Sequence, residues 1–108
     1  MDEARTISWI MYALGLASQR EPANFSAISM VADGINHAEP THKELQSSLR
    51  WLVANSLVRK QSSHYSLTEQ GMAVMETAHK QADTTFQVWA ALNDVLRLHP
   101  GLSSRRIR

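Results

Sequence analysis

Hydrophobic residues recur at three- and four-residue spacing in five stretches of the chain, which is the spacing of one face of an α-helix. The first stretch also carries Trp9 and Tyr12 outside its main apolar face. We therefore expect that helix to be well buried or to have a second contact. The five predicted helices cover residues 5–18, 26–36, 41–55, 68–80 and 85–98.

The third predicted helix has the clearest start signal. Thr41 precedes Glu44 by three residues, the spacing of a capping box in which each side chain reaches the other's backbone amide. Pro40 blocks continuation from upstream. The polar face of this helix has several hydrogen-bonding side chains and no acidic one. They are His42, Lys43, Gln46, Ser47 and Arg50.

Between the third and fourth helices the period changes from about 3.6 residues to two. Residues 57–61 and 64–67 alternate in this way around a short polar tip, Ser62 and Ser63, which is typical of a β-hairpin. The tip has neither Gly nor Asn, so the turn type stays open. The fold class is therefore mainly α with a small β-hairpin.

The stretch "LQSSLRWLVANSLVRKQSSHYSLTEQG" has a recognisable sequence pattern. Spaced leucines are followed by a short turn, then Leu-Val with basic residues, then aromatic-x-Leu-Thr-x-x-Gly. The positions are Leu49, Leu52, Leu57, Val58, Arg59, Tyr65, Leu67, Thr68 and Gly71. This stretch resembles the recognition-helix-to-wing segment of bacterial winged helix-turn-helix regulators, broadly the MarR-like and PadR-like ones.

Two features depart from that resemblance. The turn "INHAEPT" before the third helix is longer than many such regulators use, and Ser56 stands where a glycine usually follows the recognition helix. The sharp bend there must come from Asn55 or Ser56.

The resemblance implies a three-helix core with a two-stranded wing and an additional C-terminal helix. It also implies that the third helix enters the major groove of double-stranded DNA, which is about 12 Å wide, while the wing touches mostly phosphate. The implied DNA-binding residues are His42, Lys43, Gln46, Ser47, Arg50, Arg59, Lys60, Ser62, Ser63 and His64.

The expected organisation is a winged-helix domain over residues 1–80, a C-terminal helix over 81–99 and a flexible basic tail over 100–108. The C-terminal helix carries an apolar stripe that either packs on the domain's own core or forms an isologous homodimer. We expect the homodimer, because a domain this small has limited core to cover the stripe. The predicted interface residues are Phe86, Trp89, Leu92, Val95 and Leu96.

Charge is unevenly distributed along the 108 residues, whose net charge is only +1. Residues 1–40 sum to −3, residues 41–67 to +3 and residues 68–108 to +1. A basic middle segment favours an anionic partner. The alternative is a winged-helix module that docks on an unidentified protein through an apolar patch, for which Trp51 is the first suspect.

Other chemistry has little support in the sequence. There is no cysteine, and the five histidines are scattered without metal-ligand spacing. We find no nucleophile elbow and no phosphate-binding loop. We therefore expect no enzyme activity, no cofactor and no metal. The sequence shows no signal peptide and no apolar run of about 18 residues, so a cytoplasmic location is expected.

Overall fold

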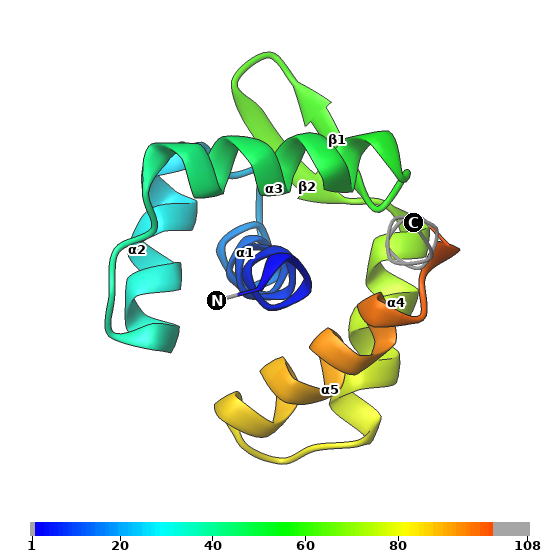
Figure 1. Cartoon of the computed structure of the whole chain (residues 1–108). Helices are drawn as coiled ribbons and strands as arrows, with labels where there is room; N and C mark the ends of the chain where they lie inside the picture. The colour runs from blue at the N-terminus through cyan, green and yellow to red at the C-terminus, as the bar shows by residue number, and fades with distance from the viewer. Residues whose placement is uncertain (1, 101–108) are drawn as a thin grey trace.

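The computed structural model of the chain describes residues 2–100 and is mainly helical, with one two-stranded antiparallel sheet (Figure 1). Each predicted helix and both predicted strands are present. The elements are α1 (Glu3–Ala17), α2 (Phe25–Asn36), α3 (His42–Ala54), β1 (Val58–Gln61), β2 (His64–Leu67), α4 (Glu69–Lys80) and α5 (Thr85–Arg97).

Helix α1 is the centre of the molecule. Figure 1 shows it end-on, with the other helices and the hairpin arranged around it. Residues 7–14 are all buried, so this part of the helix has no solvent-facing side. A helix that is apolar all round is stable only when other elements cover it on every side. Helices α2, α3, α4 and α5 and strand β2 all pack on α1, which confirms that it is well buried and contacted on more than one side.

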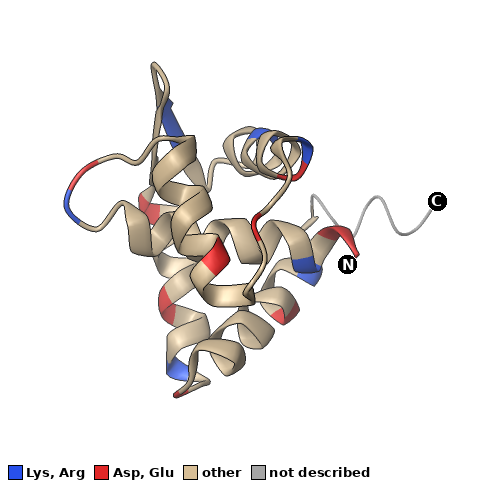
Figure 2. Cartoon of the chain, turned by 90° about the vertical axis from the view of Figure 1, so that its left-hand side faces the viewer, with Lys and Arg blue, Asp and Glu red and all other residues tan. Residues whose placement is uncertain are grey.

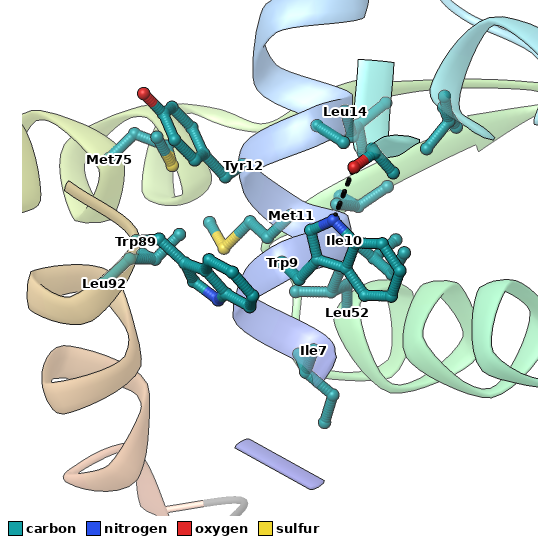
Figure 3. Packing of buried hydrophobic residues seen from close by; sticks show 14 of the residues in the cluster. Ile7, Trp9, Ile10, Met11, Tyr12, Leu14, Leu52, Met75, Trp89 and Leu92 are labelled. Carbon is teal, nitrogen blue, oxygen red and sulfur yellow. Dashed lines mark hydrogen bonds between the residues drawn. The ribbon is translucent and has the colours of Figure 1, made fainter. Parts of the chain in front are cut away.

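Two indole rings join α1 to the helices on either side. The Trp9 Nε1 group donates a hydrogen bond to the carbonyl oxygen of Ala32 in α2, at 2.9 Å (Figure 3). The ring of Trp9 lies 6.2 Å from that of Trp89 in α5, centroid to centroid. Both rings are buried, so each supplies a large apolar area to the core while its N–H group keeps a partner.

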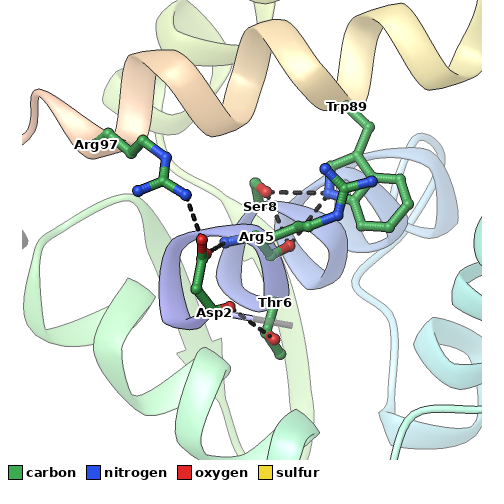
Figure 4. A network of polar contacts seen from close by, with 6 residues as sticks. All are labelled: Asp2, Arg5, Thr6, Ser8, Trp89 and Arg97. Atoms are coloured by element: carbon green, nitrogen blue, oxygen red, sulfur yellow. Dashed lines mark hydrogen bonds and ion pairs between the residues drawn. The ribbon is translucent and has the colours of Figure 1, made fainter.

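Helix α5 is attached to α1 at both ends (Figure 4). The Trp89 Nε1 group lies 3.1 Å from both the Ser8 hydroxyl and the Arg5 carbonyl oxygen, and the Arg5 guanidinium lies 4.3 Å from the centroid of the Trp89 ring. At the other end of α5, Arg97 forms an ion pair with Asp2, the N-cap of α1. Helix α5 therefore shares the core of the other helices.

This packing corrects the predicted dimer stripe. Trp89 is 1% exposed, and Leu92 and Leu96 are 0% exposed, within the single chain. The prediction that these three side chains contact a second chain is wrong, because α1 and α4 already cover them. Phe86 remains 56% exposed, and Val95 is partly exposed. The homodimer itself stays a prediction, and these two residues are what remains of its proposed interface.

The bend between α3 and β1 is made by Ser56. Its φ is 63°, whereas that of Asn55 is −100°. The Ser56 amide donates to the carbonyl of Val53, and the Leu57 amide donates to that of Leu52, at 3.1 and 3.0 Å. These two bonds are those of a Schellman motif, which closes a helix and turns the chain sharply.

The hairpin is anchored to the segment that precedes α2. Ala23 and Tyr65 exchange two backbone hydrogen bonds of 2.8 Å, so the hairpin cannot swing freely away from the body. At the tip, φ is positive at Ser62 (57°) and not at Ser63, which is the φ pattern of a type II′ turn.

Within residues 2–100, no helix combines the length and the apolar character needed to cross a membrane.

Candidate nucleic-acid interface

The solvent-facing side of α3 is a single cation-bearing surface. Its exposed positions span about 140° of the helix at about 100° per residue, and Arg50 lies near the middle of that arc. Within His42–Ala54 this arc has two cations and no acidic side chain. We call it the α3 face. Its members are His42, Lys43, Gln46, Ser47, Arg50, Val53 and Ala54.

The start of α3 is fixed by the predicted capping box. The Glu44 amide donates to the Thr41 hydroxyl at 3.0 Å, and the Thr41 amide donates to a Glu44 carboxylate oxygen at 2.9 Å. Glu44 is thereby held at the helix start, off the α3 face. The opposite side of the helix is buried through Leu45, Leu49 and Leu52, which orients the face outward.

The long connection between α2 and α3 determines where α3 begins. Residues 37–41 run back alongside α2, so that α3 begins near the N-terminal end of α2 (Figure 1). The ring of His42 lies 5.6 Å from that of Phe25, the first residue of α2. The Phe25 ring in turn lies 5.8 Å from that of Tyr65 in β2. Aromatic contacts therefore join the start of α3 to the hairpin.

The hairpin does not present its two cations on one side. In the β1–β2 register, Lys60 pairs with Tyr65 and Arg59 pairs with Ser66. Adjacent residues of a strand point to opposite faces, so Lys60 shares the Tyr65 face and Arg59 lies on the other. The Lys60 ammonium is 5.9 Å from the Tyr65 ring, on the side of Phe25.

Arg59 faces away with Gln61, His64 and Ser66. The alternation that predicted the strands also contained the signal that separates the two cations.

All ten residues predicted to bind DNA are exposed. Figure 2 shows that the cationic parts of α3 and of the hairpin lie at the same end of the molecule. The structure therefore brings together the α3 face and Lys60, while Arg59 points to the far side of the hairpin. Ser62 and Ser63 form the tip, and the Ser63 hydroxyl lies 3.4 Å from His64 Nδ1.

A groove of about 470 Å³ runs between α3 and the start of α1. Its walls mix charge of both signs, from Lys43, Arg50, Glu3 and Glu44, with an apolar floor that includes Trp51. Trp51 is only partly exposed, and the ring of His99 lies 5.3 Å from it at an interplanar angle of 68°.

Sequence reasoning missed the Ala23–Tyr65 bridge and the packing of His99 against Trp51. A single paired residue leaves no periodic pattern, so the bridge had no signal. Among the described residues, no group of three or more His, Asp or Glu side chains is placed to hold a metal ion.

Comparison of the chain with protein-family models, with curated proteins and with solved structures finds no match in any of the three.

Proposed function

We propose that this chain is a winged-helix DNA-binding protein that acts as a bacterial transcriptional regulator. Helix α3 is the recognition helix, and the β1–β2 hairpin is the wing. The observation that carries the proposal is the α3 face, one continuous exposed surface that carries Lys43 and Arg50 and has no carboxylate among its own residues. A helix of 13 residues is about 20 Å long and fits the major groove.

The side chains of the α3 face suit the two kinds of contact that such a helix makes. Gln46 is able to pair with the edge of adenine, and Arg50 with guanine or with phosphate. Lys60, on the hairpin face that is joined to α3 through Phe25, suits a backbone phosphate. Phosphate contacts supply affinity and make it fall with salt, whereas contacts to bases supply specificity.

The test is a titration of labelled mixed-sequence duplex DNA at two or more salt concentrations. We expect wild-type protein to bind at low salt and to weaken steeply as salt rises. Arg50→Ala should weaken binding several-fold and reduce the salt slope by about one, since each neutralised phosphate contributes about 0.9.

Lys80→Ala is the matched control, because Lys80 is an exposed cation at the end of α4 that pairs with Glu76. It should bind like wild type. If wild-type protein does not bind duplex DNA at low salt, the proposal is wrong.

One observation favours a second candidate function, a winged-helix module that docks on a protein. The groove beside α3 has Ile7, Trp51 and Ala54 among its lining residues, and such apolar side chains suit a protein partner. The two functions differ in their response to salt: docking on the apolar side chains of this groove should change little over a range that abolishes DNA binding.

A further inference from the structure

One aromatic ring lies between the start of α3 and the hairpin. The ring of Phe25 lies 5.6 Å from that of His42, the first residue of α3, and 5.8 Å from that of Tyr65 in β2, centroid to centroid. Lys60 continues the row, since its ammonium is 5.9 Å from the centroid of the Tyr65 ring. Phe25 therefore links the α3 face to the side of the hairpin that carries Lys60.

The main chain beside Phe25 is fixed by hydrogen bonds. Ala23, two residues earlier, exchanges two backbone hydrogen bonds of 2.8 Å with Tyr65. Asn24 caps α2, since its side-chain oxygen accepts a hydrogen bond from the Ala27 amide at 2.9 Å. These bonds fix the position of the first turn of α2, from which the Phe25 side chain extends. The ring is thus a firm support for the residues that it contacts.

The chain itself attaches the hairpin to the other end of α3. The turn at Ser56 joins the C-terminal end of this helix to β1. Phe25 contacts the opposite, N-terminal end of the helix through His42. A hairpin that is attached at both ends of a helix has a defined orientation, whereas one attached at a single end is able to pivot. Phe25 is therefore in a position to set the angle between the hairpin and the α3 face.

Phe25 is not part of the fully buried core. It is partly exposed and lines two hollows, one of about 480 Å³ that also includes His42 and one of about 420 Å³ that also includes Lys60 and Tyr65. Removal of the ring would enlarge these open hollows and would create no closed cavity in the core. We therefore expect variants at Phe25 to fold, with a hairpin that moves more freely relative to α3.

Resting on the proposed function, we propose that Phe25 is a positioning residue, whose ring holds the hairpin at the angle at which Lys60 and the α3 face contact the same duplex. Its side chain has no charge and no hydrogen-bonding group, so it acts through Tyr65 and Lys60. At 0.1 M salt the attraction between exposed charges is screened within about 10 Å. Lys60 therefore contributes to binding only while it is held close to a phosphate.

The experiment compares wild type with Phe25→Leu, which keeps an apolar side chain and removes the ring, in titrations of a mixed-sequence duplex over a salt series. We expect the affinity near 0.1 M salt to fall several-fold. The slope of log affinity against log salt should fall by about 0.9, the contribution of one phosphate. A partly unfolded population would instead lower the affinity by the same factor at each salt concentration and leave the slope unchanged.

Double variants test whether Phe25 acts through Lys60. Lys60→Ala should cause the same loss of slope as Phe25→Leu. The combination of the two should bind within about twofold of Lys60→Ala alone, because one phosphate contact cannot be lost twice. Phe25→Leu combined with Arg50→Ala should instead show the product of the two separate effects, since Arg50 contacts the duplex independently of the hairpin.

Two further variants serve as controls. Phe25→Tyr keeps the ring and should keep the slope of wild type. Phe86→Ala removes an exposed phenylalanine from α5, which lies on the other side of α1 from α3 (Figure 1), and should bind like wild type. Circular dichroism under the titration conditions checks that each variant is folded.

The outcomes separate the two proposals. A loss of slope in Phe25→Leu to which Lys60→Ala adds nothing supports the inference. An unchanged slope in Phe25→Leu, an equal loss in Phe86→Ala, additive losses at Phe25 and Lys60, or no effect of Lys60→Ala overturns it while the proposed function stands. If wild-type protein itself does not bind the duplex at low salt, both proposals fail.

Discussion

Gly71, in the first turn of α4, lies directly against the main-chain carbonyl oxygen of Leu57. A β-carbon at Gly71 would overlap that oxygen, which is backbone and cannot be moved without shifting the hairpin. The same carbonyl accepts a hydrogen bond from the Thr68 amide at 3.1 Å, and the Thr68 hydroxyl caps α4 by accepting from the Gly71 amide at 3.0 Å. This close approach explains why a threonine and a glycine stand three residues apart in the Thr-x-x-Gly pattern: Thr68 caps the helix, and only glycine fits against the Leu57 carbonyl.

Gly71→Ala should therefore destabilise the protein by about 2 kcal/mol or more, because overpacking against fixed backbone costs about 1–3 kcal/mol or more. The measurement is chemical unfolding of both proteins. Gly34→Ala is the matched control, since a β-carbon at Gly34 in α2 meets no atom within 4 Å. That change should stabilise the protein by about 0.5–1 kcal/mol. Effects of the same sign at the two glycines would contradict the packing described.

Ser56 is the second position at which backbone geometry sets an expectation. A serine with φ of 63° is in a left-handed conformation that is strained for residues with a side chain and that glycine adopts freely. Ser56→Gly should raise the free energy of unfolding by about 0.5–1 kcal/mol. Asn55→Gly should lower it, because Asn55 has a negative φ and its side chain donates to the Trp51 carbonyl. Urea titrations of the two variants would check the difference.

The burial of α5 predicts that two of its aromatic residues, Trp89 and Phe86, contribute very differently to the free energy of unfolding. Trp89→Ala should cost about 3–5 kcal/mol, since it opens a large cavity and removes the N–H donor to the Ser8 hydroxyl. Phe86→Ala should cost about 1 kcal/mol or less, because Phe86 is 56% exposed. A Trp89→Ala protein of unchanged stability would show that this residue is not in the core.

The two hairpin cations should differ in DNA binding although they are neighbours in sequence. Lys60→Ala removes the charge on the Tyr65 face, which is joined to the start of α3, and should weaken binding several-fold. Arg59→Ala removes the charge on the opposite face and should have the smaller effect. The two variants have the same net charge, so a duplex titration at one salt concentration is enough. Equal effects would mean that the wing contacts DNA through both faces.

The lowered pKa of Asp2 predicts that the stability of the protein depends on pH. The hydrogen bond from the Arg5 amide, helped by the Arg97 guanidinium, holds the pKa of Asp2 below its ordinary value of 3.8. A carboxyl whose pKa is lower in the folded state stabilises the fold above its unfolded pKa. That contribution is lost as the pH falls through the folded pKa.

Asp2→Asn keeps a good helix cap and removes only the charge. It should therefore be less stable than wild type at pH 7, and the gap should close below about pH 4. Thermal unfolding of both proteins from pH 7 to pH 2 measures this. A gap that persists at pH 2 would show that the carboxylate charge is not its cause.

The secondary structure was predictable because each element has a local cause. The capping box of α3 and the two-residue period of the hairpin lie within a few residues of sequence, and both are present as expected. The apolar run of the first helix also indicated, correctly, more than one contact.

What could not be predicted depends on contacts between distant residues. The stripe of α5 has the same sequence whether it covers its own core or a partner, and only its packing on α1 and α4 decides between the two. The Ala23–Tyr65 bridge joins residues far apart in sequence. The alternation of the strand places Arg59 and Lys60 on opposite faces, but the resemblance implied both together as DNA-binding residues, and the sequence analysis did not separate them.

The central position of α1 has a consequence for synthesis of the protein. Helix α1 is made before the other described helices, and its buried side chains at 7–14 are fully covered only when α5 has been made. The apolar surface of α1 therefore stays partly uncovered until α5 has been synthesised, and uncovered apolar surface favours aggregation of a growing chain.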